Sequence, residues 1–290
     1  MNSFNIKGVK MAFLKMILLL LLLSSINASG QKPFFRNIKV PDQVNETTIT
    51  CLYQDLNSYM WIGTGKGVYK FDGNNFIYYP GTGKEATLQV SSVFMTPDQV
   101  LWIGTRKGDI YNFKGDSLRL FNPEEGNPKV AITGFTLDEQ GNLWFSTYGE
   151  GVYYYDGKRI SNLNTDDGLT DNYCYSVVTD KYGRIWVATD GGISVCSISD
   201  GKKSISTITT SDGLPDNIVL SLTSDENFIW AGMQDAGICK IAADSKKISV
   251  PESSLTWPYG PVKDIVTGAN WLWLSTERNG IISLEKETGT

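Results

Sequence analysis

The sequence predicts an all-β fold, a six-bladed β-propeller built from four-stranded antiparallel blades. Two observations predict it: a tryptophan-centred segment recurs six times, and short strand-like runs separated by glycine and aspartate turns surround each copy. Successive copies lie 41, 42, 42, 44 and 43 residues apart, and their tryptophans are Trp61, Trp102, Trp144, Trp186, Trp230 and Trp273. A repeat of this length with four strands is typical of a propeller blade.

Every repeat has the same internal order of runs and turns. In the fourth repeat a β-rich run at 175–179 precedes a turn at 180–184, and Trp186 lies in the run that follows. A glycine turn then leads into a third run, as at 151–155, and an Asp-Gly turn such as Asp156-Gly157 leads into a fourth. β-Branched and aromatic runs bounded by Gly and Asp indicate antiparallel hairpins.

Burial explains why tryptophan recurs. A strand near the centre of a propeller is covered on both faces by neighbouring blades, and adjacent residues such as Trp61 and Ile62 point to opposite faces. The glycine or serine two residues after the tryptophan, as at Gly63 and Ser146, would let the next blade approach closely. We therefore expect the tryptophans to pack between blades and not to form a ligand cage.

The two ends of the repeat array suggest how the ring closes. The sixth repeat supplies only three strands, at 262–266, 271–276 and 280–285, whereas residues 35–39 have the spacing of an outer strand with no blade before them. Pairing residues 35–39 with 281–285 would cover two exposed sheet edges. We expect this N-terminal strand to close the last blade of a six-bladed ring; the alternative is part of a seven-bladed propeller.

Residues 1–30 have the pattern of a signal peptide. Three lysines precede an apolar run at 16–23, and small and polar residues follow at 24–30. The apolar run is shorter than the roughly 20 residues that a spanning helix needs, and no later stretch is long enough. We expect cleavage to leave residues 31–290 as a periplasmic or secreted propeller domain with no membrane span.

Composition argues against several classes of function. Loss of the three lysines in the signal changes the net charge from −5 to −8, and the remaining chain has no basic cluster, which argues against a nucleic-acid partner. The chain contains no histidine, which removes the usual general base, the Ser-His-Asp and Cys-His nucleophile systems and most zinc sites. We expect no catalytic residues, no metal site and no cofactor.

Cysteines and paired carboxylates are two further residue types that carry chemistry in many proteins. The four cysteines lie in apolar strand patterns without a C-x-x-C pair, so we expect them to be reduced and structural. Carboxylate pairs at 124–125, at 166–167 and at 212 with 216 would suit a glycosidase only at a separation that the sequence does not define.

The composite pattern D-x-x-G-x-[IL]-W-[IV]-[GA]-T-x-x-G-[VI], followed by aromatics and an Asp-Gly turn, resembles the two-component regulator propeller repeat. The resemblance extends over residues 35–290 and departs from the pattern at Pro97-Asp98, Met233 and Thr267. It implies a periplasmic sensor region of the kind that passes ligand binding, often of glycan fragments, to a transmembrane hybrid sensor kinase. The chain would then be a stand-alone sensor-like propeller or the N-terminal piece of a longer sensor.

Candidate ligand-binding residues follow from propeller geometry. The turns between the second and third runs of all blades open on one face, and they hold Arg106, Lys107, Tyr148, Glu150, Asp190, Gln234, Asp235 and Arg278. Trp257 and Tyr259 form an aromatic pair, expected to be exposed, in a connection between blades on the same face. Mixed polar groups beside aromatic platforms suit a sugar.

The predicted function is ligand binding in two-component signalling, with an oligosaccharide, a sensor kinase or another protein as partner. The alternatives are a propeller glycoside hydrolase or lyase and a pure protein-interaction scaffold.

Overall fold

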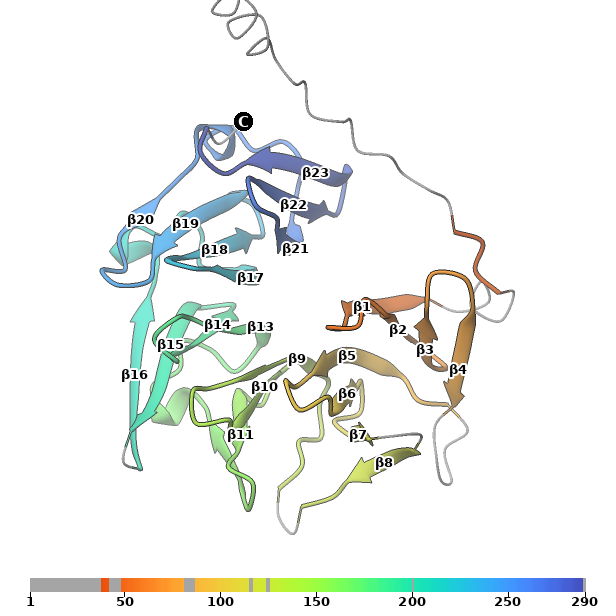
Figure 1. Ribbon diagram of the computed structural model, residues 1–290. Helices are drawn as coiled ribbons and strands as arrows, with labels where there is room; N and C mark the ends of the chain where they lie inside the picture. Colours follow the sequence, from red (N-terminus) through yellow and green to blue (C-terminus); the bar gives the residue numbers. More distant parts are fainter. Residues whose placement is uncertain are drawn as a thin grey trace, which may run out of the picture. The chain divides into compact units, whose positions relative to one another are not determined.

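Each repeat of the computed structural model folds into one antiparallel sheet whose strands follow the order of the sequence (Figure 1). The structure describes residues 38–41, 48–80, 87–114, 117–123, 126–199 and 201–288. The first three sheets are formed by β1 (Ile49–Gln54), β2 (Met60–Thr64), β3 (Gly67–Phe71) and β4 (Phe76–Pro80); by β5 (Val90–Met95), β6 (Leu101–Thr105), β7 (Ile110–Lys114) and β8 (Ser117–Phe121); and by β9 (Ile132–Leu137), β10 (Leu143–Thr147), β11 (Val152–Tyr155) and β12 (Ile160–Leu163).

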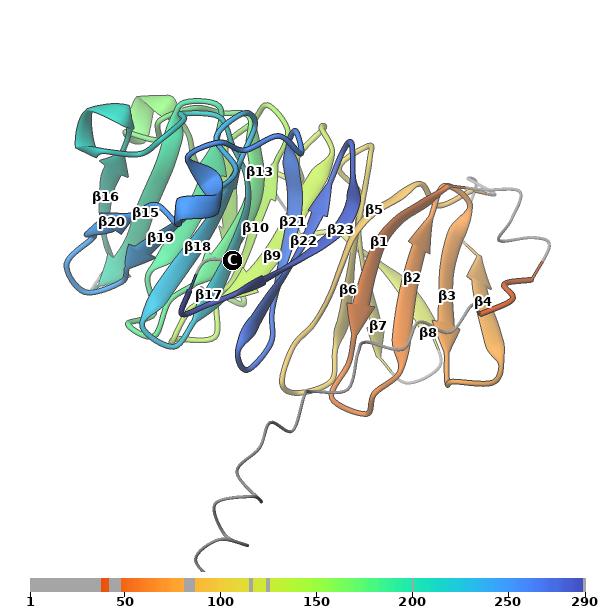
Figure 2. The same cartoon turned by 90° about the horizontal axis from the view of Figure 1, so that it is seen from above.

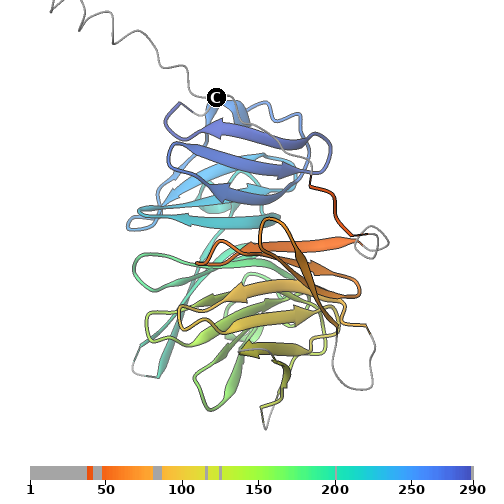
Figure 3. The same ribbon diagram turned by 45° about the vertical axis from the view of Figure 1, so that its right-hand side comes forward.

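The remaining sheets repeat this arrangement. They are formed by β13 (Cys174–Thr179), β14 (Ile185–Thr189), β15 (Gly192–Ser199) and β16 (Lys202–Ile208); by β17 (Val219–Asp225), β18 (Phe228–Met233), β19 (Ile238–Ala242) and β20 (Ile248–Ser249); and by β21 (Val262–Thr267), β22 (Trp271–Thr276) and β23 (Gly280–Glu285). From β1 to β21, the first strand of each sheet contacts the first strand of the next. The fold is a six-bladed β-propeller, which confirms the prediction. Figure 2 shows strands of successive blades side by side, and Figure 3 shows the fifth and sixth sheets, in cyan and blue, stacked on each other.

The six-residue spacing between aspartate and tryptophan in the first, third and fourth repeats has a structural cause. In the first blade Asp55 Oδ1 accepts the backbone N–H groups of Asn57 and Tyr59, both at 2.9 Å, which holds the turn between β1 and β2. The other carboxylate oxygen, Oδ2, accepts the indole N–H of Trp61 at 2.9 Å. The sequence predicted a hairpin turn at this aspartate but not the bond to the indole.

The tryptophans of the first five blades pack between neighbouring sheets, as expected. Trp186 is fully buried, and its cluster includes Val219, Leu222 and Ile229 of the fifth blade. Trp61, Trp102, Trp144 and Trp230 are buried in the same way against the blade that follows each of them. Trp273 of the sixth blade is only half-buried, so the prediction holds for five of the six described repeats.

The glycine after the tryptophan is needed for the close approach of blades. A Cβ added at Gly104 would lie 2.5 Å from Cβ of Ile132, the first residue of the next blade. A Cβ at Gly232 would lie 2.7 Å from Cγ1 of Val262, which has the same place in the sixth blade. Both distances are too short for carbon atoms in contact, so these positions exclude any side chain.

The sixth sheet has three strands among the described residues, as the sequence predicted. Of the proposed closing strand, residues 35–37 lie outside the described residues, and Ile38 and Lys39 are not in a strand. Ring closure by residues 35–39 therefore stays a prediction. The signal peptide at 1–30 also lies outside the described residues. No helix in the described part of the chain is long and apolar enough to cross a membrane.

All four cysteines are free in the structure. Cys174, Cys196 and Cys239 are buried, and Cys51 is partly buried. Burial raises the pKa of the Cys51 thiol to about 11 and that of Cys196 and Cys239 to about 12, so these thiols stay protonated near neutral pH. They act as small apolar side chains, as the strand pattern predicted.

Candidate ligand-binding site

A β-bulge at the same position of every first strand builds the lining of the central cavity. In each blade the pairing between the first and second strands skips one residue of the first strand. A bulge of this kind redirects the side chain of the extra residue. The skipped residues are Thr50, Ser91, Thr133, Tyr175, Leu220 and Lys263, and all six line a central cavity of about 520 Å³.

In the second and third blades the bulge hydroxyls connect neighbouring blades. Ser91 Oγ donates to the carbonyl oxygen of Ile132 at 2.7 Å, and Thr133 Oγ1 donates to that of Cys174 at 2.8 Å. These two side chains are therefore engaged in holding the inner strands together.

In the fourth and sixth blades the bulge residues instead reach the turns between the second and third strands. We call the face of the propeller on which these turns lie the loop face. Tyr175 Oη donates to Asp190 Oδ1 at 2.8 Å, and Lys263 Nζ forms an ion pair with Glu277 Oε2 at 3.1 Å. Asp190 follows β14 and Glu277 follows β22, so both acids belong to turns between second and third strands. Two residues that line the cavity thus contact the face on which the candidate residues were predicted.

Three tyrosines gather at this end of the cavity. Tyr148, in the turn after β10, lies edge-to-face with Tyr173 at 5.0 Å between ring centroids and with Tyr175 at 5.7 Å. Tyr148 and Tyr173 are 48% and 46% exposed, so both present aromatic surface to solvent. We call Tyr148, Tyr173, Tyr175 and Asp190 the tyrosine cluster. Burial, together with the hydrogen bond to Asp190, raises the pKa of Tyr175, which keeps its phenol protonated as a donor.

Asp264 also lines the cavity, one residue after the bulge of the sixth blade. The surrounding protein desolvates its carboxylate and raises its pKa, although the backbone N–H of Ile265 donates to Oδ1 at 2.9 Å. The cavity therefore holds one acid whose charged form is disfavoured, beside the Lys263–Glu277 ion pair.

Among the predicted site residues, Tyr148 and Asp190 are brought together through Tyr175. Tyr173 and Tyr175 were not predicted, although two tyrosines at the start of the first run of the fourth repeat were a visible signal. The other five repeats have no aromatic residue at either equivalent position. Position 175 could not be assigned to the cavity because the bulge that turns it inward is not readable from alternation.

Glu150 lies in the same turn as Tyr148, but its side chain contacts its own blade and the connection that precedes it. Its Oε2 accepts the Tyr153 hydroxyl at 2.9 Å and the backbone N–H of Lys129 at 3.2 Å. This carboxylate is half-buried and ties the turn to the preceding connection.

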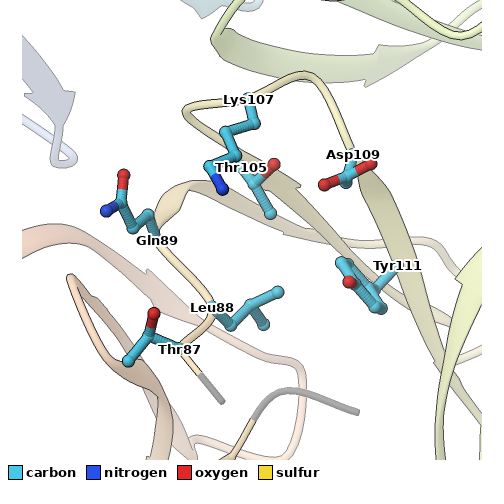
Figure 4. A pocket seen from close by; sticks show the side chains of 7 residues that line it. All are labelled: Thr87, Leu88, Gln89, Thr105, Lys107, Asp109 and Tyr111. Carbon is cyan, nitrogen blue, oxygen red and sulfur yellow. The ribbon is translucent and has the colours of Figure 1, made fainter. Parts of the chain in front are cut away.

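Arg106 and Lys107 are exposed in the turn after β6. Lys107 lines a cavity of only about 20 Å³ together with Gln89, Thr105 and Asp109 (Figure 4). This volume holds about one water-sized molecule, so the turn offers no cavity for a sugar.

In the fifth blade Gln234 and Asp235 hold the turn to the preceding connection through their backbone N–H groups. That of Gln234 donates to the carbonyl of Ile218 at 3.0 Å, and that of Asp235 donates to Asp216 Oδ2 at 3.1 Å. The Asp235 side chain is exposed and that of Gln234 half-buried, so both remain candidates at the rim.

The expected exposed aromatic pair is in fact half-buried, which corrects the sequence prediction. Trp257 packs against the core of the last blade, and its indole N–H donates to the carbonyl of Gly260 at 2.7 Å. Its ring lies 4.9 Å from that of Tyr259, edge-to-face. The connection closes over the turn of the fifth blade, because a Cβ at Gly237 would lie 2.7 Å from the Trp257 ring. Arg278 is exposed beside this connection.

Of the carboxylate pairs that the sequence offers, Asp167 and Asp212 are engaged in short 3₁₀ helices. Asp167 Oδ2 accepts the backbone N–H of Asn164 at 3.1 Å in η1 (Thr165–Asp167), and Asp212 Oδ2 accepts that of Thr209 at 2.9 Å in η2 (Thr210–Asp212). Residues 124 and 125 lie outside the described residues. The described ranges contain no cluster of acids and cysteines that could hold a metal ion.

A family model described as the two-component regulator propeller matches residues 168–191. This segment is a two-component regulator propeller repeat. It begins in the loop after η1 and ends after β14, so it includes Tyr173, Tyr175 and Asp190 of the tyrosine cluster. The resemblance drawn from the repeated pattern is confirmed at this repeat.

Solved structures share the fold. The extracellular domain of a putative hybrid two-component system from B. thetaiotaomicron is 24% identical with a TM-score of 0.67, over 82% of this chain and 34% of that one. A second such domain from B. thetaiotaomicron is 23% identical with a TM-score of 0.69, over 84% and 32%. A catalytically inactive histidine-to-alanine variant of virginiamycin B lyase from Staphylococcus aureus is 17% identical with a TM-score of 0.62, over 83% and 85%.

The chain thus spans about a third of the length of the two-component structures that it matches. A comparison with curated protein sequences finds no match.

Proposed function

We propose that this chain is a sensor propeller that works outside the cytoplasm and binds an oligosaccharide at the loop-face mouth of its central cavity. The observation that carries the proposal is the tyrosine cluster, in which two exposed rings stand beside a hydrogen-bonded tyrosine–aspartate pair. The similarity to extracellular domains of putative hybrid two-component systems supports the location and the signalling role, with a sensor kinase as partner.

The chemistry of the mouth suits a sugar. The apolar faces of a pyranose stack on aromatic rings, and its hydroxyls require both donors and acceptors. Tyr148 and Tyr173 supply rings, Asp190 supplies acceptors, and Lys263 and Glu277 supply a donor and an acceptor from the sixth blade. A cavity of about 520 Å³ lies within the usual range for ligand sites.

We propose binding without turnover. The lyase with the same fold is inactive when one of its histidines is replaced, and this chain has no histidine to supply. Asp167 and Asp212, one acid of each pair within the described residues, are held by backbone N–H groups of their own loops. A general acid must reach a bound substrate, and these acids point into their own loops.

The test is calorimetric titration of the purified chain with a panel of neutral and acidic oligosaccharides, followed by chromatography of the mixtures for products. We expect at least one oligosaccharide to bind with no product formed. Tyr148→Ala and Tyr173→Ala should each weaken that binding about tenfold or more, since stacking contributes most when the ring is freely presented.

Tyr182→Ala is the matched control. Tyr182 is 46% exposed, like Tyr173, but it lies in the turn between β13 and β14 at the opposite face. Its replacement should leave binding unchanged. Formation of product would refute binding without turnover and indicate an enzyme. Binding that neither Tyr148→Ala nor Tyr173→Ala weakens would refute the location of the site.

A further inference from the structure

The second blade lacks the hydrogen bond that joins the tryptophan to its turn in three other blades. In the first, third and fourth blades the indole N–H donates, at 2.8–2.9 Å, to an aspartate six residues earlier in the chain. In the second blade the residue six positions before Trp102 is Thr96, which has no carboxylate. The indole N–H of Trp102 has no hydrogen-bond acceptor among the described residues.

The turn of the second blade otherwise keeps the shape that it has in the first. The backbone N–H of Thr96 donates to the carbonyl of Val100 at 3.0 Å, and that of Gln99 donates to the carbonyl of Thr96 at 2.9 Å. The same two bonds, at the same two distances, close the turn of the first blade, where Ser58 has the φ of 64° that Gln99 has here. The indole N–H of Trp102 is therefore directed to the side of Thr96, where the first blade holds a carboxylate.

A pocket of about 170 Å³ lies at this position, between the second and third blades and on the face opposite the loop face. Thr96, Asp98 and Trp102 line it from the second blade. Trp102 is only 9% exposed, yet its Nε1 is not sealed from solvent, whereas the unpaired Nε1 of Trp230 is. An unpaired donor in a largely buried side chain is costly, and it marks the position where a ligand acceptor would be stabilised.

The walls of this pocket are largely apolar. Aliphatic side chains cover much of them: Val100, Leu137 and Leu143. Tyr155 adds a ring whose hydroxyl already donates to the carbonyl of Gly157 at 2.7 Å. Phe121 lies edge-to-face with the rings of Trp102 and Tyr155, at 5.0 and 4.9 Å between centroids, which fixes the two aromatic walls. An apolar cavity of about 150 Å³ is enough to bind benzene, so this pocket can hold one small ring.

The polar groups of the pocket favour an uncharged ligand. The Trp102 N–H presents the positive end of a dipole, which disfavours an ammonium group beside it. The carboxylate of Asp98 is exposed, and its Oδ1 accepts the Thr96 hydroxyl, so this acid disfavours an anion in the same pocket. A hydroxyl group both accepts and donates, and it can satisfy the indole N–H and the carboxylate together.

We propose that the pocket between the second and third blades binds a small uncharged molecule that carries one hydroxyl on an apolar body of about the size of phenol. The hydroxyl oxygen accepts the Trp102 indole N–H, in the place that an aspartate oxygen fills in the first, third and fourth blades, and the hydroxyl proton is donated to Asp98. The apolar body contacts Leu137, Leu143 and Tyr155. The site lies away from the loop face and does not depend on the oligosaccharide site.

Titration of the ¹⁵N-labelled chain with phenol, followed through its tryptophan indole N–H signals, tests the proposal. Benzene is the control without a hydroxyl, and benzoate and benzylammonium are the charged controls. We expect a saturable shift of the Trp102 signal with phenol, binding at least tenfold weaker with benzene, and no shift with either charged probe. The Trp144 signal should stay in place because its acceptor is internal, and the Trp230 signal because its N–H is sealed. Trp102→Phe identifies the signal.

A double variant fills the site from within the chain. Thr96→Asp combined with Asp98→Asn recreates the Asp-x-Asn turn of the first blade, where Asp55 is followed by Asn57, and supplies the Trp102 N–H with its own acceptor. It should raise Tm, shift the Trp102 signal without ligand and abolish its response to phenol.

Asp98→Asn alone is the matched control, because it keeps Thr96 and the unpaired indole N–H. It should weaken phenol binding only about fivefold, since a neutral acceptor replaces a charged one. A Trp102 signal that does not respond to phenol would show a pocket that holds water only and would overturn the proposal. Equal affinity for phenol and benzene, or phenol binding that survives the double variant, would overturn it as well.

Discussion

Asp138→Ala removes the group that joins a hairpin turn to a buried tryptophan. Asp138 is 8% exposed, and its carboxylate accepts the N–H groups of Gln140 at 3.0 Å and Asn142 at 2.8 Å and the indole N–H of Trp144 at 2.8 Å. The variant leaves the Trp144 N–H, which is fully buried, without an acceptor, at a cost of about 1–3 kcal/mol. The turn amides are only part-buried, and their loss adds about 1 kcal/mol, because water replaces the carboxylate there.

We therefore expect Asp138→Ala to lower the free energy of unfolding by about 3 kcal/mol, measured by urea denaturation followed by circular dichroism. For a domain of this size that corresponds to a fall of roughly 6–12 °C in Tm. Asp225→Ala is the comparison, because Asp225 has no bond to an indole and loses only its ion pair with Lys286, worth about 1 kcal/mol. Equal losses in the two variants would refute the role of the indole bond.

Two other measurements address burial and charge. Trp144→Ala should lower the free energy of unfolding by about 3–5 kcal/mol, and Trp273→Ala, at a half-buried position, by less than half as much; equal losses in urea denaturation would contradict the packing described for the blades. Asp264→Asn should raise Tm at pH 7, because the raised pKa of Asp264 means that folding disfavours its charged form, and the gain should vanish as the pH falls below about 4, where the carboxyl is protonated in both states. A Tm difference that does not change between these pH values would contradict the desolvation of Asp264.

The number of blades and the burial of their core could be predicted from the sequence because six repeats sample the same environment. Trp144 and Gly104 each stand at a position where the repeated residue type is itself the physical requirement: a large apolar ring between sheets, or a small residue where two sheets approach closely. Repetition separates such requirements from chance.

The details of the candidate site depend on features that the pattern does not encode. Tyr175 enters the cavity because a bulge shifts the strand by one residue, and a shift of one residue reverses the face of every side chain beyond it. Trp257 was expected to be exposed because it lies in a connection, yet the connection folds onto Gly237 and the last blade. The indole N–H of Trp230 has no hydrogen-bond acceptor among the described residues, because the hairpin before it is one residue shorter than in the first blade. The spacing of the tryptophans alone does not reveal this difference.

The blade-by-blade arrangement has a consequence for how the chain folds as it is synthesised. All strands of the first sheet come from residues 49–80, and its hydrogen bonds to other sheets run to the next blade, as from Tyr53 Oη to the carbonyl of Met95. Contacts in such an array are local or join nearest neighbours, so each sheet can form as soon as its segment has left the ribosome, without waiting for the rest. The half-formed molecule then always ends in one uncovered blade face, and the next repeat to emerge, about 42 residues long, is the element that covers it.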